Sequence, residues 1–310
     1  MIIGHQRILD FLKSSIKKNK ISHAYLFYGP ANIGKKKVAL EFVRILIGQD
    51  AENTMHPDVL IVEPEIEEKK GVKKELEISI DQARQIRRQI SLSAHHAPYK
   101  IVIIDGVEKM TRQAANALLK TLEEPLGRTV IILLCSNLQQ VLPTIISRCQ
   151  LIKFLPVPNL EIEKILFKSY KADASDFKKI IRLACGRPGL VINYLTNPAL
   201  LKEQDQLLAD IENLIKADLN SRYLYIEKIA KDISGARYIL NTWLLWFRDL
   251  ALLSCGCRDL IINQKTASFK HQYSLNQLKN IIQSIRKTDN MLQNPSINSR
   301  LALEVLMLGF

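Results

Sequence analysis

One segment limits the fold of this chain more than any other. Residues 29–36 read GPANIGKK, and they follow an apolar run at Ala24–Tyr28. After them, apolar residues recur at helical spacing on one face, and Gly48 is placed to end that helix. These apolar positions are Val38, Ala39, Phe42, Val43 and Leu46. A strand, a glycine-containing loop and a helix in this order are the context of a phosphate-binding loop, so we expect an α/β unit.

The loop retains part of the chemistry of phosphate binding. In this loop, which also contains Pro30, the glycines Gly29 and Gly34 would let backbone N–H groups turn toward phosphate oxygens, and Lys35 would neutralise the outer phosphates. The next position normally supplies a Ser or Thr hydroxyl to a magnesium ion, but Lys36 has no lone pair to offer a cation. Magnesium binding of the usual kind is therefore lost. The alternative is a glycine-containing turn with no ligand at all.

A second element lies at Lys100–Asp105, an apolar strand that ends in an acid. In a phosphate-loop ATPase this acid supports the magnesium ion, so Asp105 is the candidate. Active members commonly place a glutamate next, whereas this chain has Gly106, and Glu108 comes two residues too late to substitute directly. The hydroxyl ligand normally found at position 36 and the glutamate normally found at position 106 are thus both missing. For Asp105 itself, the alternative is that it only caps the following helix.

The order of apolar and helical patterns predicts the layout of the chain. Further strands are expected at 59–63, 129–135 and 151–155, which together with the first two form a parallel sheet. The mixed-charge stretch 65–74 indicates an exposed hairpin or loop. Pro156 and Pro158 interrupt the pattern, and the rhythm beyond them is helical. We therefore place a domain boundary there.

The second half predicts a helical bundle. Ser274 and Gln277 form a capping box, and Tyr273 and Leu278 are spaced as a hydrophobic staple at the start of a helix. The apolar stripe of that helix is expected to consist of Leu275, Leu278, Ile282 and Ile285. The run 243–247, WLLWF, is apolar nearly all round, so we expect a buried helix there.

Composition narrows the partners and the compartment. Lys and Arg outnumber Asp and Glu by 44 to 31, and the net charge of +13 favours polyanionic partners. The cysteines are scattered in a pattern that predicts neither disulfides nor a zinc site. They are Cys135, Cys149, Cys185, Cys255 and Cys257. No run approaches the roughly 20 apolar residues of a membrane-spanning helix, and no signal peptide opens the chain, so we expect a cytoplasmic protein.

Two longer segments resemble a known family. Residues 110–125 read MTRQAANALLKTLEEP, and residues 142–149 read LPTIISRC. Both are similar to bacterial clamp-loader subunits of the AAA+ class, and the resemblance covers residues 3–154, with weaker support at 243–250. It implies an AAA+ phosphate-loop α/β domain at 1–157, a small helical lid at 158–204 and an all-α collar that oligomerises at 205–310.

The resemblance also assigns roles to single residues. Arg148 would be an arginine finger that reaches the ATP of a neighbouring subunit, since its planar charged fork suits phosphate oxygens. Asn137 falls where active relatives have a water-sensing polar residue, although a turn-forming asparagine is the alternative. Active motor subunits usually carry a sensor arginine where this chain has Gly189, and Arg187 is out of register with it. Residues 47–56 lack the cysteines that many relatives use for zinc, so no zinc is expected.

We therefore expect a non-hydrolysing clamp-loader subunit, with other loader subunits, the sliding clamp and primer-template DNA as partners. Binding of ATP or ADP at the altered loop is doubtful. A competent motor subunit, or another AAA+ replication ATPase, would use Lys35 and Asp105 itself, but Lys36, Gly106 and Gly189 argue against that reading. A DNA-binding module without ring partners would account for the charge and for none of the motifs.

Overall fold

The computed structural model describes residues 2–48, 56–69, 72–91, 97–125, 127–167, 170, 174–269, 273–292, 294 and 297–310. The chain packs as two compact units. The first consists of Met1–Tyr170 with Ala184–Val191, and the second of Lys171–Leu183 with Ile192–Phe310. A division into three domains with limits after residues 157 and 204 stays a prediction.

A five-stranded sheet of order β2-β5-β6-β1-β7 forms the centre of the first unit, and all its neighbouring strands run parallel. The strands are β1 (Ala24–Tyr28), β2 (Val59–Val62), β5 (Lys100–Asp105), β6 (Thr129–Cys135) and β7 (Gln150–Lys153). The predicted strands are confirmed, with β2 one residue shorter and β7 shifted toward its start. The α/β phosphate-loop class predicted from the sequence is confirmed with them.

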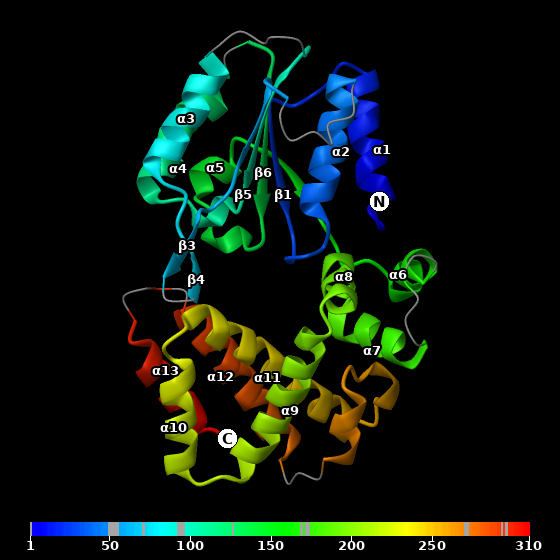
Figure 1. Cartoon of the computed structure of the whole chain (residues 1–310), viewed down its shortest axis with the longest axis vertical. Coiled ribbons are helices and arrows are strands. Elements are labelled where there is room, and N and C mark those ends of the chain that lie inside the picture. Colours follow the sequence, from blue (N-terminus) through cyan, green and yellow to red (C-terminus); the bar gives the residue numbers. More distant parts are fainter. Residues whose placement is uncertain are drawn as a thin grey trace. The chain divides into compact units, whose positions relative to one another are not determined.

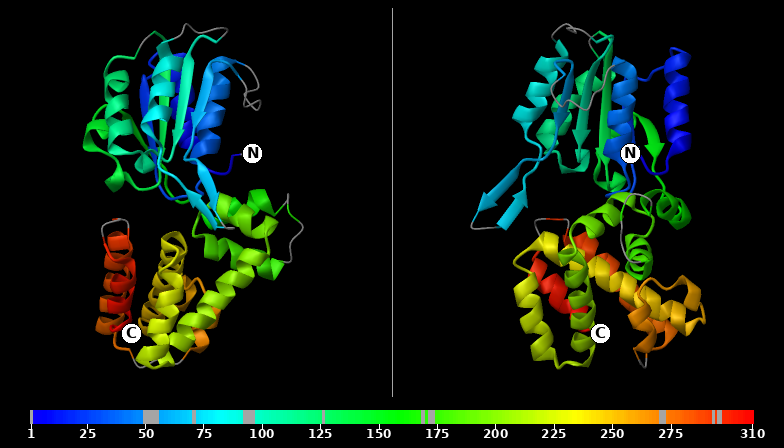
Figure 2. Two further views of the ribbon diagram at one scale, coloured as in Figure 1. Left: turned by 60° about the vertical axis from the view of Figure 1, so that its left-hand side comes forward. Right: turned by 45° about the vertical axis from the view of Figure 1, so that its right-hand side comes forward.

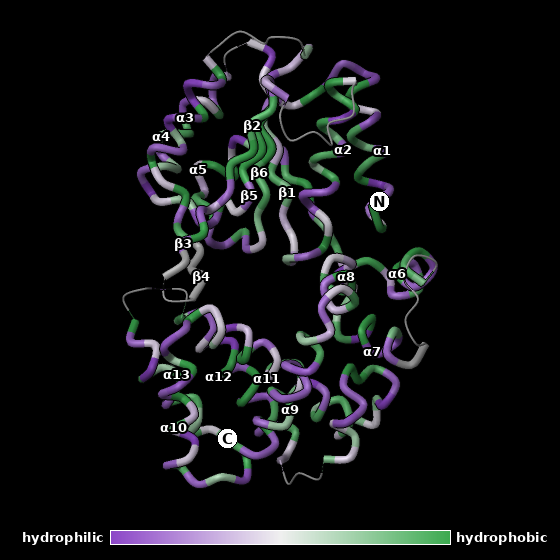
Figure 3. The backbone as a smooth tube through the Cα atoms, in the orientation of Figure 1, coloured by the Kyte–Doolittle hydropathy of each residue, from purple (hydrophilic) through white to green (hydrophobic). Residues whose placement is uncertain are grey.

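Helices cover both faces of this sheet, as Figure 1 shows. One face packs against α1 (Gln6–Lys17) and α2 (Lys35–Ile47), and the other against α3 (Ile80–Ser91), α4 (Arg112–Glu123) and α5 (Pro143–Ile146). Successive strand residues alternate between the two cores because side chains along a strand point to opposite faces. The central strands β5 and β6 are accordingly mostly hydrophobic in Figure 3, which is typical of a sheet buried on both sides.

The hairpin predicted at 65–74 is present as β3 (Ile66–Lys69) and β4 (Val72–Glu75), an antiparallel pair that extends away from the main sheet (Figure 2). Its expected Gly71 lies outside the described residues. Three shorter helices follow the sheet: α6 (Asn159–Leu166), α7 (Ala174–Ala184) and α8 (Pro188–Thr196). Helix α8 begins in the first unit and ends in the second.

The second unit is helical, as predicted. Its main helices are α9 (Ala199–Lys216), α10 (Leu219–Ile229), α11 (Ile233–Ser254), α12 (Leu275–Leu292) and α13 (Ser299–Met307). Trp243, Trp246 and Phe247 are fully buried, which confirms the buried helix expected there. None of the helices in the described part of the chain has the length and hydropathy needed to cross a bilayer.

The start of α12 tests the predicted cap. The backbone N–H of Ser274 donates to Gln277 Oε1 at 2.8 Å, and that of Gln277 donates to Ser274 Oγ at 3.3 Å, so the capping box is confirmed. The apolar stripe is partly wrong, because Leu275 is 50% exposed. As the first residue of the helix it precedes the turn that packs on the core, and Ile281 lies in the stripe with Leu278.

A buried arginine ties the ends of two helices of this unit. The guanidinium of Arg222, only 8% exposed, donates to the carbonyls of Leu214 and Ile215 in the last turn of α9. It also donates to the carbonyls of Met307, at the end of α13, and Phe310. The last carbonyls of a helix have no partner within the helix, so one side chain satisfies the C-terminal carbonyls of two helices.

Candidate functional site

The glycine-containing loop connects β1 to α2, as predicted, and packs closely against the strand beside it. Gly29 has φ 151°, and a Cβ at this position would come 2.4 Å from the carbonyl oxygen of Phe154. Only glycine fits such an approach. Gly34 is the N-cap of α2 with φ 110°, and Asn32 has φ 61°. The loop is therefore shaped by close packing within the first unit.

Lys35 is buried and satisfied by its own loop. Its ammonium donates to the carbonyls of Gly29 at 2.7 Å and Pro30 at 2.8 Å, with Ser136 Oγ at 3.5 Å. An ammonium has three N–H donors, so these three acceptors account for all of them. Burial lowers the pKa of Lys35, and the carboxylates of Glu108 and Asp105 oppose that effect. The lysine expected to meet phosphate thus has intramolecular partners throughout.

Lys36 points elsewhere and forms an ion pair with Glu63, both side chains being nearly half exposed. The alternative in which Asp105 caps the next helix is wrong, because Gly106 is the N-cap of the short helix η1 (Val107–Lys109), which has no side-chain cap. Burial raises the pKa of Asp105, and the charge of Lys36 is the strongest influence against this shift. The Lys36 side chain thus lies near the carboxylate that would otherwise support magnesium.

Glu108 is a member of this site that sequence reasoning set aside. One carboxylate oxygen accepts the backbone N–H of Ser136 at 2.8 Å, and the other is buried without a hydrogen-bond partner among the described residues. The helix η1 turns the chain back after β5, which brings Glu108 to the end of β6, near Lys35. Gly106, with φ 83°, starts this turn, and a glycine directly after a strand is the sequence feature that could have indicated it.

Asn137 and Gly189 each form a contact within their own chain, and the water-sensing role of Asn137 stays a prediction. Asn137 Oδ1 accepts the backbone N–H of Gln139 at 3.1 Å as the N-cap of η2 (Leu138–Gln140), in agreement with the turn-forming alternative. The N–H of Gly189 donates to the carbonyl of Asn32 at 2.8 Å. A Cβ at Gly189 would lie 2.8 Å from that same oxygen, so this position packs on the loop and leaves no room for a side chain.

Arg148 lies apart from the loop, after the one-turn helix α5. Its Nε donates to Glu123 Oε1 at 2.8 Å, and its Nη2 bonds to the same oxygen. Its Nη1 donates to the carbonyl of Thr144 at 2.8 Å and reaches Ser147 Oγ at 3.3 Å. The side chain is 31% exposed. Arg148 is therefore ordered by its own chain and accessible to another.

These residues do not fit a magnesium nucleotide. Lys36 replaces the hydroxyl ligand, Lys35 is engaged by loop carbonyls, and Gly189 packs against Asn32. Within the described part of the chain, no group of three or more His, Cys, Asp or Glu side chains is arranged to hold a metal ion.

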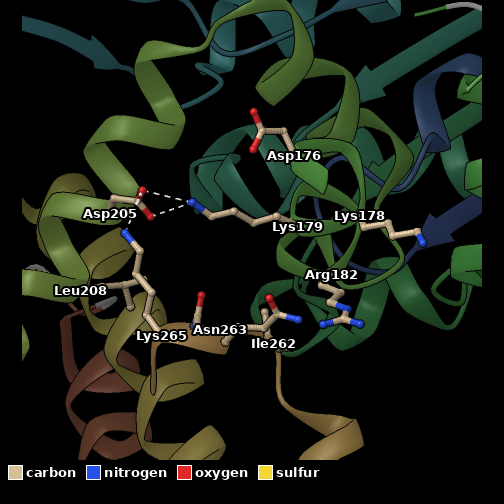
Figure 4. Close-up of a pocket in the computed structure, with 10 residues that line it drawn as sticks. Asp176, Lys178, Lys179, Arg182, Asp205, Leu208, Ile262, Asn263 and Lys265 are labelled. Atoms are coloured by element: carbon tan, nitrogen blue, oxygen red, sulfur yellow. Dashed lines mark hydrogen bonds and ion pairs between the residues drawn. The ribbon is translucent and has the colours of Figure 1, made fainter. Parts of the chain in front are cut away.

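The second unit contains a cavity of about 380 Å³, which Figure 4 shows. Lys179 Nζ lies 3.0 Å from both carboxylate oxygens of Asp205, and Lys265 Nζ lies 3.3 Å from one of them. These ion pairs connect α7 and α9 to the short helix η4 (Gln264–Ser268). Another short helix, η3 (Arg258–Leu260), comes before η4 in the chain. Because the two lysines are used to join helices, this cavity is best explained as a structural junction.

The fold and the site together define an α/β phosphate-loop module with an altered loop and an ordered, accessible arginine. The profile of the family described as "DNA polymerase III, delta subunit" matches residues 4–158. The chain belongs to this family.

Curated relatives agree with this assignment. The chain is 32% identical to the DNA polymerase III subunit delta' of Pseudomonas aeruginosa, over 64% of this chain and 63% of that protein. It is 28% identical to the delta' subunit of Bacillus subtilis, over 87% and 84% of the two chains. It is also 32% identical to the gamma subunit of Buchnera aphidicola, over 94% and 86%. The match thus spans less than two thirds of the Pseudomonas relative.

Proposed function

We propose that this chain acts as a delta-prime-type subunit of the DNA polymerase III clamp loader. In this role it hydrolyses no ATP itself and supports the ATP-driven loading of the sliding clamp onto primed DNA. The observation that carries the proposal is the contrast between two cations: Lys35 is buried on its own loop carbonyls, whereas Arg148 is partly exposed. Arg148 then serves as an arginine finger for ATP on a neighbouring subunit.

The partners follow from the same proposal. They are the gamma or tau and delta subunits in a hetero-oligomeric ring, the sliding clamp and primer-template DNA, in the cytoplasm. The division into an α/β domain at 1–157, a lid at 158–204 and a collar at 205–310 belongs to this proposal. The similarity to gamma subunits supports the shared family, but Lys36, Gly106 and Gly189 are not the residues that a motor subunit would need.

The test of the non-hydrolysing role is ATP turnover by the purified chain alone with magnesium. We expect no turnover above background, and no loss when Lys35→Ala is introduced. Lys37→Ala, a change at an exposed position in the same helix, is the matched control for handling and purity. Turnover by the wild-type chain that Lys35→Ala abolishes would show a competent ATPase and reject the proposal.

A further inference from the structure

The Arg148 side chain is hydrogen-bonded to the carboxylate of Glu123, a residue outside the Ser147-Arg148-Cys149 motif. Glu123 is the last residue of α4, and its Oε1 accepts from both Nε and Nη2 of Arg148. Thr144 and Ser147 hold the Nη1 edge. All three partners belong to the same unit of this chain, so the arrangement exists before any neighbour binds.

The backbone of Arg148 is fixed independently of Glu123. The N–H of Arg148 donates to the carbonyl of Ile145 at 3.1 Å, and the Ile145 side chain is 1% exposed. On the other side, the Cys149 thiol packs on the sheet core, and burial raises its pKa to about 12. The Ser-Arg-Cys motif therefore anchors its cysteine and projects its arginine. What remains to be set is the direction of the long arginine side chain.

A count of donors shows how Glu123 can set this direction without blocking the site. A guanidinium has five N–H donors. The contacts to Glu123 use one on Nε and one on Nη2, and those to Thr144 and Ser147 use both on Nη1. One Nη2 donor remains. Glu123 is 48% exposed, and such an ion pair is weak enough to exchange with a phosphate.

We infer that Glu123 is a positioning residue for Arg148, which holds the guanidinium at the surface in the orientation that meets an anionic phosphate on a neighbouring subunit. This inference rests on the proposed arginine-finger function. Arginine loses much rotamer freedom when it is ordered, so an arrangement formed in advance spares that loss in the transition state. If Glu123 were instead a lock that withholds the arginine, its removal would accelerate hydrolysis.

The test is a double-mutant cycle in the reconstituted clamp-loader complex, with ATP turnover measured in the presence of clamp and primed DNA. We expect Glu123→Ala to lower kcat at the site that Arg148 faces by about 5- to 30-fold, with little change in KM for ATP. In an Arg148→Ala background the same change should have no further effect. Glu124→Ala, at the next residue along, removes a carboxylate to which no bond from Arg148 is seen, and should leave kcat unchanged.

Two further measurements distinguish positioning of Arg148 by Glu123 from a role of Glu123 in folding, and from the role of Arg148 in hydrolysis. Glu123→Gln keeps an acceptor for Nε and Nη2 and should recover a large part of the rate. In the isolated chain, the heteronuclear NOE of the Arg148 Nε–H group should fall in Glu123→Ala and stay high in Glu124→Ala, whatever the role of Arg148 in hydrolysis.

The outcomes are distinct. If Arg148→Ala leaves turnover unchanged, the finger and the inference that rests on it are both rejected. If Arg148→Ala lowers turnover but Glu123→Ala does not, or raises it, only the positioning role is rejected. Equal losses from Glu123→Ala in the wild-type and Arg148→Ala backgrounds would assign Glu123 a general structural role and reject positioning.

Discussion

Two cations of the first unit, Lys35 and Arg148, were both predicted to act on phosphate, and the structure treats them differently. Lys35 is 7% exposed, and two of its contacts are to carbonyls of the loop that carries it. Arg148 is 31% exposed and paired with a half-exposed carboxylate. A buried cation with internal partners is held within its own fold, whereas a partly exposed one in a weak ion pair can exchange partners.

Arg222 is a buried cation of the second unit, and its replacement by alanine should have the largest effect on stability. Arg222→Ala removes all four bonds from the buried guanidinium to carbonyls at the ends of two helices, so we expect a loss of about 3–5 kcal/mol in the free energy of unfolding. Urea unfolding followed by circular dichroism measures this loss. Arg237→Ala breaks an ion pair with Asp289 in which the Arg237 side chain is 39% exposed; it is the control and should cost less than about 1 kcal/mol. Similar losses in both variants would break the link between burial and stability.

Lys35→Ala should have the next largest effect, and it should be an effect on folding. Removal of the ammonium leaves the carbonyls of Gly29 and Pro30 unpaired, which we expect to cost about 1–3 kcal/mol. Thermal unfolding with and without ADP measures both parts of this prediction. Stabilisation of the wild-type chain by ADP that disappears in Lys35→Ala would show instead that the lysine binds nucleotide.

Cys149, the residue next to Arg148, should give the smallest effect, which is a slow reaction of its thiol with an alkylating reagent. Burial raises the pKa of Cys149 from 9.0 to about 12, so the folded state keeps a proton that the unfolded state loses. The protonated Cys149 thiol therefore contributes to the free energy of unfolding below pH 9, and this contribution is lost as the pH rises from 9 toward 12. At pH 9, iodoacetamide should modify the exposed Cys255 much faster than Cys149. Equal rates in the folded chain, compared with a urea-unfolded control, would contradict the anchored motif.

The sequence predicted the sheet and the loop because their signals are local. Apolar runs such as Thr129–Cys135 are buried on both faces, and Gly48 ends α2 with φ 74°, as its position indicated. The second unit was foreseen as helical, but the exposure of Leu275 was not, because periodicity does not show which turn first reaches the core.

The site was predicted less completely, because its partners are distant in the chain. Spacing alone could not bring Glu108 to Ser136, nor show that Gly189 packs on Asn32. The pairing of Arg148 with Glu123 spans 25 positions and depends on where α4 ends relative to α5. Residue types gave the candidates, and tertiary packing decided which of them have intramolecular partners.

The most direct comparison of Lys35 with Arg148 is the ATP turnover of the reconstituted clamp loader with either residue replaced by alanine. With Arg148→Ala in this chain, turnover at the neighbouring site should fall by about 10³-fold or more while the complex still assembles. With Lys35→Ala, turnover per assembled complex should stay at the wild-type value. The reverse pattern, with Lys35 essential and Arg148 dispensable, would contradict the account.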